Sequence, residues 1–330
     1  MKYINILHAT TNIWFLHQID HLRFDSEYIF YENSNKEIIW DLVVVYECIQ
    51  DSISLKYKKG GLLFISGEPP MSNIYSRNFL RQFDMLITSH PNITHPNNKL
   101  CQQALPWHYG IDYNTKKAKF DFAYLQNIES DFKTKNISVI TSSKKMMPGH
   151  NRRIKFLNLL KEKFPNKIDY YGMGVNPVLD KAEAILPYRF HICIENSQIY
   201  DYWTEKLADP LLGFSIPIYI GCLNIDKYFN TEGMYILSLD NENDILETIS
   251  KILVDPEKAY QSKLSALRNN RLKLLNEFNI FSLIDKTLKE DLNIESEQIE
   301  TTIKNNSFFV EYKLRMIFLR LKRMLYKIFN

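Results

Sequence analysis

Short apolar runs, rich in β-branched and aromatic residues and bounded by turn residues, recur along the whole chain. In the first half they occupy residues 2–7, 41–47, 61–66 and 83–88. In the second half they occupy residues 137–143, 167–172, 190–195, 215–221 and 234–239. Helix-like stretches separate the runs, among them residues 152–164 and a helix opened by Asp255 as N-cap and Pro256 at the first helical position. This double alternation predicts an α/β fold of two domains with mostly parallel sheets.

The length of 330 residues fits two domains of ordinary size. A polar stretch at residues 127–136 is the predicted junction. We therefore expect one domain over residues 1–130, a second over 131–287, and a terminal segment over 288–330 that opens with a polar, acidic linker. Charged residues make up 24% of the chain, close to the globular average, which argues against a largely disordered protein.

The four cysteines do not fall at a metal-ligand spacing such as Cys-x-x-Cys. They are Cys48, Cys101, Cys193 and Cys222. A zinc site and a disulfide framework are both unexpected in a chain of this length with this spacing. We expect buried, free thiols in a reducing compartment.

The amino-terminal stretch MKYINILHATTNIWF lacks the sustained apolar core of a signal peptide. No stretch approaches the roughly 18 uninterrupted apolar residues of a membrane-spanning helix. The sequence therefore predicts a cytoplasmic protein, or one that binds a membrane from the cytoplasmic side.

Residues 308–330 predict a basic amphipathic helix. One face carries Leu314, Ile317, Phe318, Leu321, Leu325 and Ile328. The basic residues that lie mostly opposite are Lys313, Arg320, Arg323 and Lys327. Such a helix suits an anionic membrane surface, although packing against the protein itself or a second copy would bury the same face. Nucleic acid is not an expected partner, because the basic residues alternate with an apolar face and form no groove-reading motif.

A crowded polar stretch, ENSQIYDYWTEK at residues 195–206, lies between two apolar runs. It follows a predicted strand and leads into a helix for which Asp201 or Thr204 is the candidate N-cap. The free N–H groups of a helix start at the carboxyl edge of a sheet bind phosphate well, and Lys206 would add charge there. Glu205 suits the hydroxyl groups of a ribose or a sugar. These residues are equally consistent with a helix cap on the protein surface, in which the Glu-Lys pair is solvated and binds no ligand.

Residues 189–221, RFHICIENSQIYDYWTEKLADPLLGFSIPIYIG, resemble the donor-binding signature of glycosyltransferase family 10, the α-1,3/4-fucosyltransferases. The patterns ENSQ-x-Y-x-Y-x-TEK and IPIY-x-G are similar to those of the bacterial members, and weaker similarity covers residues 60–290. The resemblance implies a GT-B fold of two Rossmann-like domains facing a central cleft, followed here by the C-terminal amphipathic helix. In that family the C-terminal domain binds GDP-fucose and the N-terminal domain carries the catalytic base and the acceptor site.

The same resemblance implies an inverting reaction that requires no cofactor, with the GDP-sugar as co-substrate. No metal is needed to hold the diphosphate, although divalent cations stimulate some members. The chain has no Asp-x-Asp metal motif, which agrees with this expectation.

The donor-binding residues follow from the resemblance one at a time. Glu205 and Lys206 match the family's Glu-Lys pair, with Lys206 on the diphosphate, and Asn196 and Tyr202 match the amide and the aromatic residue beside the nucleotide sugar. An arginine opens the helix after the first strand of the donor domain. The predicted donor set is Arg153, with Arg152 as the fallback, and Glu195, Asn196, Tyr202, Thr204, Glu205 and Lys206. Asp201 and Trp203 are not fixed by the signature and are expected to tune the donor pocket.

The predicted catalytic base is Glu68, in FISGEPP, which follows the strand at 61–66 as a Gly-Glu step does in the family. Without the resemblance, Glu68 reads equally well as a turn residue before Pro69 and Pro70. Polar and aromatic candidates for the acceptor cleft are Asn12, Trp14, Trp107 and His108.

Together these features predict an inverting α-1,3-fucosyltransferase that moves L-fucose from GDP-fucose to a hydroxyl of a bacterial surface glycan such as lipopolysaccharide. We expect it to work peripherally on the inner face of the bacterial cytoplasmic membrane, since no N-terminal anchor of the Golgi type is found. One alternative is a family member with another GDP-deoxyhexose donor. A second is a non-catalytic sugar-nucleotide-binding partner protein, which the joint presence of Glu68, Arg153, Glu205 and Lys206 disfavours.

Overall fold

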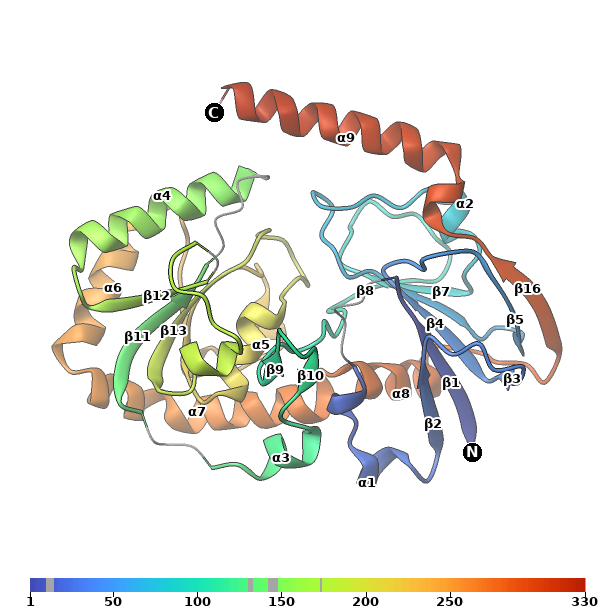
Figure 1. Ribbon diagram of the computed structural model, residues 1–330, viewed down its shortest axis with the longest axis horizontal. Coiled ribbons are helices and arrows are strands. Elements are labelled where there is room, and N and C mark those ends of the chain that lie inside the picture. Colours follow the sequence, from blue (N-terminus) through green and yellow to red (C-terminus); the bar gives the residue numbers. More distant parts are fainter. Residues whose placement is uncertain (10–14, 130–132, 142–147, 173, 330) are drawn as a thin grey trace. The chain divides into compact units, whose positions relative to one another are not determined.

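The computed structural model describes residues 1–9, 15–129, 133–141, 148–172 and 174–329 (Figure 1). The chain forms two compact units. Unit 1 comprises Met1–Ala104 and Asn279–Asn330, and unit 2 comprises Leu105–Phe278.

The predicted boundary at residue 130 is wrong, because apolar side chains before it join the core of unit 2. Trp107, Phe122 and Leu125 all pack in that core. The predicted end of the second domain at residue 287 is also too late, since the chain returns to unit 1 at Asn279.

The main sheet of unit 1 is entirely parallel, with the strand order β2-β1-β4-β6-β7-β8. Its strands are β1 (Lys2–Leu7), β2 (Tyr28–Glu32), β4 (Leu42–Tyr46), β6 (Leu62–Ile65), β7 (Met85–Thr88) and β8 (Asn98–Leu100). All four predicted strands are confirmed, and the order reverses direction between β1 and β4. The short helices α1 (His21–Phe24) and α2 (Arg77–Leu80) lie in the connections.

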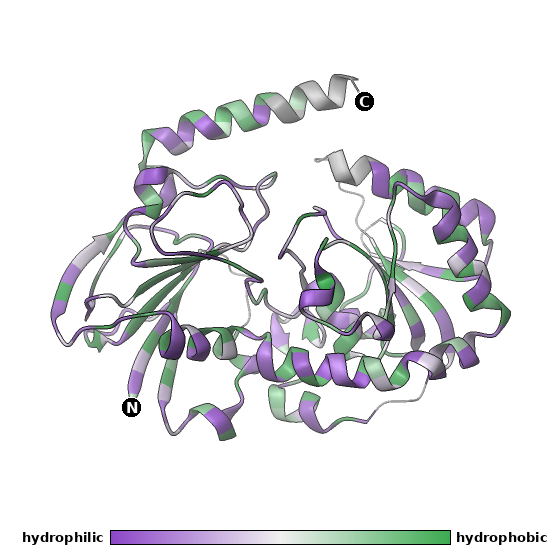
Figure 2. Cartoon of the chain, turned by 180° about the vertical axis from the view of Figure 1, so that it is seen from behind, coloured by the Kyte–Doolittle hydropathy of each residue, from purple (hydrophilic) through white to green (hydrophobic). Residues whose placement is uncertain are grey.

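Both faces of this sheet are buried, which is why its strands read as continuous apolar runs. On one face Val44 packs in the same cluster as Phe281 and Ile284 of α8 (Ile280–Glu290). On the other face Val43 and Val45 pack with residues of α2 and of the C-terminal segment. Figure 2 shows the central strands of unit 1 as mostly hydrophobic.

A smaller sheet gives the C-terminal segment a structural role. In it, β5 (Ile53–Lys58) pairs in parallel with β3 (Ile39–Trp40) and antiparallel with β16 (Gln298–Ile303). The prediction of a plain linker after residue 288 is therefore wrong, because alternate residues of β16 turn inward and Ile303 is fully buried. The chain then forms a short turn, η5 (Asn306–Phe308), and the predicted terminal helix, α9 (Val310–Phe329).

Unit 2 has a parallel sheet with the order β12-β11-β13-β14-β15. Its strands are β11 (Lys135–Ile140), β12 (Ile168–Tyr171), β13 (Tyr188–Ile194), β14 (Ile216–Ile220) and β15 (Tyr235–Ile236). They confirm the second set of predicted strands, and the order reverses between β11 and β13.

Four helices cover the sheet of unit 2. They are α4 (Pro148–Lys163), α5 (Glu205–Leu212), α6 (Glu242–Val254) and α7 (Pro256–Glu277). Helix α4 packs beside α6, while α5 and α7 pack on β13 and β14. The predicted start of α7 is confirmed, since the Asp255 side chain accepts a hydrogen bond from the backbone N–H of Lys258. A hairpin of β9 (Ile111–Asp112) and β10 (Lys117–Ala118), the helix α3 (Phe122–Asn127) and the turn η2 (Lys181–Ala184) complete the unit.

The four cysteines are free thiols, and Cys193 and Cys222 are buried as predicted, whereas Cys48 and Cys101 are only half-buried, contrary to the prediction. In the part of the chain that the structure describes, no helix is both long and apolar enough to cross a bilayer.

Asn306 provides a test of how firmly the C-terminal segment is integrated into unit 1. Its buried side chain accepts a hydrogen bond from Ser76 N at 3.0 Å and donates one to Ile74 O at 2.9 Å. We expect Asn306→Ala to lower the free energy of unfolding by about 1–3 kcal/mol, because both main-chain groups lose their partner. Urea denaturation measures the loss. Ser307→Ala, at the exposed neighbour, is the control and should change stability by less than about 0.5 kcal/mol. Equal stability of the two variants would contradict this role of the segment.

Candidate functional site

In open parallel sheets, ligands bind beyond the carboxyl ends of the strands, where the strand order reverses. In unit 2 this point lies between β11 and β13. Helix α4 follows β11, and Glu195 and Asn196 directly follow β13. The predicted donor residues therefore gather at the edge where the topology favours a ligand.

Arg153, from the first half of α4, lies at this edge and is buried. Its Nη1 donates a hydrogen bond to Asn196 Oδ1 at 3.2 Å. Burial lowers the pKa of Arg153 from its usual value, because the buried cation is poorly solvated. An anion beside the guanidinium would replace the lost solvation and be attracted to it. Arg152 is exposed and pairs with Asp240 at 2.6 Å. Arg153, and not the fallback Arg152, thus occupies the predicted position.

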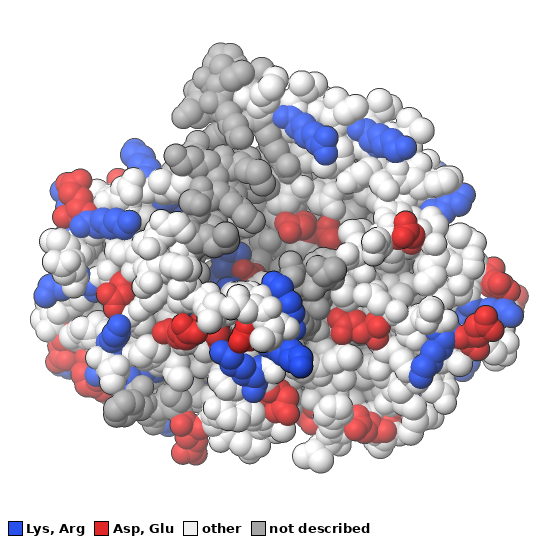
Figure 3. All heavy atoms as spheres, in the orientation of Figure 1, with Lys and Arg blue, Asp and Glu red and all other residues white. Residues whose placement is uncertain are grey.

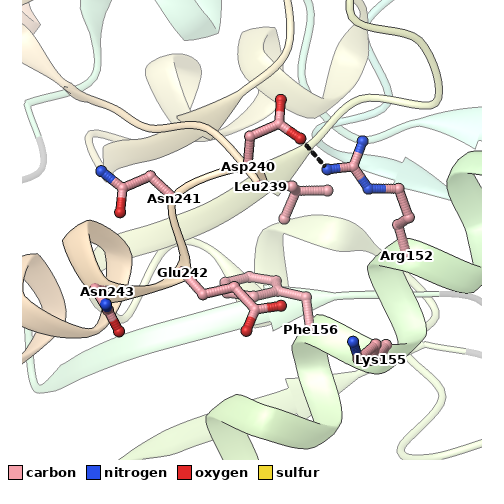
Figure 4. A pocket seen from close by; sticks show the side chains of 8 residues that line it. All are labelled: Arg152, Lys155, Phe156, Leu239, Asp240, Asn241, Glu242 and Asn243. Atoms are coloured by element: carbon pink, nitrogen blue, oxygen red, sulfur yellow. Dashed lines mark hydrogen bonds and ion pairs between the residues drawn. The ribbon is translucent and has the colours of Figure 1, made fainter.

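Beside α4, a hollow of about 520 Å³ continues the carboxyl edge toward the start of α6 (Figure 4). It is lined by Arg152, Lys155, Phe156, Leu239, Asp240, Asn241, Glu242 and Asn243. Figure 4 shows the Arg152–Asp240 ion pair at its rim. No sequence pattern predicted this hollow, because its two walls are more than 80 residues apart in the chain.

The start of α5 is fixed by Glu195. Thr204 is the N-cap, and its hydroxyl accepts a hydrogen bond from Lys206 N at 3.2 Å. Thr204 in turn donates two hydrogen bonds to the carboxylate of Glu195. Its backbone N–H donates to Oε1 at 2.8 Å, and its hydroxyl donates to Oε2 at 2.8 Å. The Glu195 side chain has no exposed surface. The prediction that it contacts the donor is therefore corrected: in this structure Glu195 anchors the helix start.

Five charged side chains of alternating sign extend from this anchor into α5, and we name them the charge chain: Glu195, Lys206, Glu205, Lys181 and Asp209. Lys206 Nζ lies 3.7 Å from Glu195 and 3.1 Å from Glu205. Lys181 Nζ lies 3.5 Å from Glu205 and 2.8 Å from Asp209. Each lysine thus sits between two carboxylates.

The charge chain keeps Glu205 ionised. Burial alone would raise the pKa of Glu205, but the ammonium groups of Lys206 and Lys181 outweigh it and hold the pKa well below the usual range. Burial likewise works against the charge of Lys206, but Glu205 and Glu195 raise its pKa. Glu205 can therefore accept hydrogen bonds from hydroxyl groups, and Lys206 remains a cation at the N-terminus of α5.

Sequence reasoning missed Lys181 and Asp209. Asp209 carried a usable signal, since it lies four residues after Glu205 and hence on the same face of α5. It also accepts hydrogen bonds from the backbone N–H groups of His108 and Tyr109, which ties the segment after Pro106 to α5. Lys181 lies in the short turn η2, and nothing in its local sequence marks it.

Several aromatic candidates are structural. Trp107 is fully buried in the core of unit 2, so it does not line an acceptor cleft. Trp203 packs edge-on against Tyr228, Phe229 and Phe278, and so does not tune a donor pocket. Tyr202 is also buried.

The two polar candidates Asp201 and His108 both lie in unit 2. Asp201 is engaged in its own loop, where it accepts hydrogen bonds from Asn224 and Lys227. His108 is half-buried in unit 2, and its charge would act on Glu205.

In unit 1, Glu68 is exposed on the loop that follows β6. The loop main chain is held on both sides: Glu68 N donates to Glu47 Oε2 at 2.9 Å, and His90 Nε2 lies 2.7 Å from Glu68 O. Burial lowers the pKa of His90, so its neutral ring donates through Nε2. The predicted acceptor residues Asn12 and Trp14 lie outside the described residues.

Among the residues that the structure describes, no group of three or more His, Cys, Asp or Glu side chains is placed to hold a metal ion. The expectation that a divalent cation is stimulatory and not required remains a prediction.

Residues 130–262 match the family described as "Glycosyltransferase family 10 (fucosyltransferase) C-term". The matched segment carries the pattern of the C-terminal part of that family. It contains Arg153, Asn196 and the whole charge chain, and the resemblance seen in residues 189–221 is confirmed.

Relatives named as fucosyltransferases agree with this match. The α-(1,3)-fucosyltransferase FucT of Helicobacter pylori is 34% identical over 105 residues, which cover 32% of this chain and 21% of that protein. The α-(1,3)-fucosyltransferase B of Drosophila melanogaster is 32% identical over 120 residues, or 36% of this chain and 26% of that protein. The chain thus matches about a fifth to a quarter of the length of these relatives.

Solved structures extend the likeness to the fold of both units. A crystal structure of an α1,3-fucosyltransferase is 18% identical with a TM-score of 0.50, covering 90% of this chain and 92% of that one. A structure of an α1,3-fucosyltransferase with GDP-fucose is 19% identical with the same TM-score, covering 90% and 93%. The chain therefore has the GT-B type of fold, with two parallel α/β sheets.

Lys181 provides a test of the charge chain. We expect Lys181→Met to lower the free energy of unfolding of the protein by about 3–5 kcal/mol, because Asp209 is buried and loses its counter-charge. Urea denaturation gives the value. The control is Lys251→Met, whose exposed ammonium lies 2.7 Å from the exposed Glu247, so that its loss should cost less than about 1 kcal/mol. Similar losses in the two variants would show that Lys181 has no special place in the network.

Proposed function

We propose that this chain is an inverting α-1,3-fucosyltransferase that uses GDP-fucose as its donor. The observation that carries the proposal is the placement of Arg153, Asn196 and Lys206 at one carboxyl edge, within the family 10 segment. The names of the two relatives and of the GDP-fucose-bound structure of the same fold support the donor.

In the proposed complex, the nucleotide diphosphate lies between α4 and the N-terminus of α5. The guanidinium of Arg153 and the ammonium of Lys206 neutralise its charge, with the free N–H groups of α5 adding to the attraction. Glu205, kept ionised by two lysines, accepts hydrogen bonds from hydroxyl groups of the donor. The proposed arrangement needs no metal to hold the diphosphate, and turnover in the presence of EDTA measures whether a cation contributes.

The reaction is a single displacement at the anomeric carbon of fucose. The acceptor hydroxyl oxygen forms the new bond to C1 from the face opposite GDP, and its proton passes to the carboxylate of Glu68. The bond between C1 and the phosphate oxygen breaks, and GDP leaves with the electron pair. Arg153 and Lys206 stabilise the charge that develops on it. A β-linked donor thereby gives an α-linked product.

We further propose a glycan of the bacterial surface, such as lipopolysaccharide, as the acceptor. The bacterial source of a relative with 34% identity supports this choice. Incubation with GDP-[¹⁴C]fucose and a panel of surface glycans identifies the acceptor by the label that it gains.

Glu68 tests the mechanism. We expect Glu68→Gln to lower kcat for fucose transfer by about 10²–10⁴-fold, because the amide cannot take the hydroxyl proton. The Kd for GDP, measured by calorimetry, should stay unchanged, since the proposed GDP contacts are all in unit 2. Full transfer activity in Glu68→Gln would refute the assignment of the base.

The same assay separates the rival functions. A member of the family with a different donor would turn over GDP-mannose or a GDP-amino sugar faster than GDP-fucose. A non-catalytic partner protein would bind GDP and transfer no sugar to any acceptor in the panel.

We also propose that α9 binds an anionic membrane surface. Along its apolar side Leu314, Ile317 and Phe318 are each more than half exposed, so unit 1 does not cover this face. Lys313 and Arg320 are exposed as well, and Figure 3 shows basic side chains standing along the helix. An exposed apolar stripe joined to basic residues is the pattern of helices that lie in the headgroup region of anionic bilayers. The side chains of Arg323, Leu325, Lys327 and Ile328 lie outside those that the structure describes.

Vesicle sedimentation tests this surface. We expect binding to phosphatidylglycerol vesicles to fall at least about tenfold in Leu314→Asp/Phe318→Asp, since burial of one such side chain contributes about 1.5–3 kcal/mol. The control is Leu22→Asp on α1, where an exposed leucine gains the same charge away from α9. If wild type and the double variant bind equally weakly, and wild type alone is a dimer by light scattering, a second copy is the occupant instead.

A further inference from the structure

Glu47 lies at the point of unit 1 that corresponds to the donor edge of unit 2. The strand order of the main sheet reverses between β1 and β4, and Glu47 is the first residue after β4. This is where the topology of an open parallel sheet favours a ligand. Nothing in the sequence around YECIQ singled the residue out.

The side chain of Glu47 is directed into the loop that carries Glu68. Its Oε2 accepts hydrogen bonds from the backbone N–H of Gly67 at 2.6 Å and of Glu68 at 2.9 Å. Two side chains complete the cluster, with Tyr75 OH donating to Oε2 and Asn73 Nδ2 donating to Oε1, each at 2.5 Å. One carboxylate thus ties together both ends of the segment from Gly67 to Tyr75.

The donors of this cluster are themselves fixed. Tyr75 is buried, and burial together with the nearby carboxylate of Glu47 raises its pKa well above the usual value, so that it remains a hydroxyl donor. Ser66, just before the loop, donates to Thr88 Oγ1 at 2.8 Å. The contact of His90 with Glu68 O closes the cluster from the side of β7.

The backbone of Glu47 is strained. Its φ is +65°, a left-handed conformation that costs a residue other than glycine about 1–3 kcal/mol. Strand β4 is followed by this bend, which turns the chain at the carboxyl edge of the sheet. Glycine would adopt the bend without strain, but it would lack the carboxylate. A glutamate here indicates that the side chain has a use that outweighs the strain.

We propose that Glu47 is a positioning residue for the transfer reaction: its carboxylate holds the Gly67–Glu68 main chain so that the carboxylate of Glu68 is presented to the acceptor hydroxyl. The inference rests on the proposed function, in which Glu68 is the base. Positioning of this kind acts on kcat, since a displacement of the base by about 1 Å is enough to cost about 10²-fold in rate.

The test compares Glu47→Gly, Glu47→Gln and Glu68→Gln in fucose transfer, with kcat, the KM for GDP-fucose and the Kd for GDP measured for each. Glu47→Gly retains the bend and removes the side chain, so kcat should fall about 10²-fold. Glu47→Gln can still accept from the two backbone N–H groups but meets the donor of Asn73 with an amide, so kcat should fall about 10-fold. The KM for GDP-fucose and the Kd for GDP should stay within about twofold of wild type in both.

The matched control is Asp41→Asn, just before the other end of the same strand, where the carboxylate also accepts a backbone N–H, from Tyr3 at 2.7 Å. Like Glu47→Gln, it replaces a carboxylate acceptor by an amide, and it loses the ion pair with Lys58, so it perturbs a comparable structural contact and should leave kcat unchanged. If Glu47→Gly does not fold, the Gln variant decides, because it retains the length of the side chain.

Wild-type kcat in both Glu47 variants, with Glu68→Gln inactive, overturns the positioning role of Glu47 and leaves the proposed base intact. Wild-type kcat in Glu68→Gln overturns the proposed base itself. A fall in kcat equal to that of Asp41→Asn would also refute a positioning role.

Discussion

The contact between the buried carboxylate of Glu195 and Thr204 is the constraint on which the geometry of the unit 2 site depends. The two residues are nine positions apart, so their hydrogen bonds close the polar loop and set where α5 begins. Removing a carboxylate from water is costly, and here two donors of Thr204 and the nearby Lys206 ammonium offset part of that cost, although burial still raises the pKa of Glu195. Because the start of α5 is fixed, Glu205 and Lys206, its first two residues, have defined positions at the edge of the sheet.

Unit 1 uses a related device with different parts. There the carboxylate of Glu47 holds the main chain of a loop, whereas Glu195 holds the first turn of a helix. In both units an acidic side chain just after a central strand fixes the segment that bears a proposed site residue. Each carboxylate combines hydrogen bonds from main-chain N–H groups with hydrogen bonds from side chains, namely Thr204 in unit 2 and Asn73 and Tyr75 in unit 1.

Much of the fold could be predicted because strands buried on both faces leave continuous apolar runs, and because caps such as Asp255 act locally. The site was only partly predictable. A sequence shows that Glu195 is polar but not that it is buried, and it cannot show that Trp107 belongs to a core. Lys181 and Glu47 were missed since their partners lie far away in the chain. The family signature allowed prediction of site residues only within one continuous stretch of sequence, residues 189–221.

The return of the chain to unit 1 after Phe278 has a consequence for folding during synthesis. Unit 2 is an insertion between two parts of unit 1, since α8 covers one face of the first sheet and β16 pairs with β5. When unit 2 has left the ribosome, unit 1 still lacks both elements. The unit encoded in the middle of the sequence can therefore complete its core first, while the N-terminal sheet keeps an apolar face exposed until α8 and β16 are made.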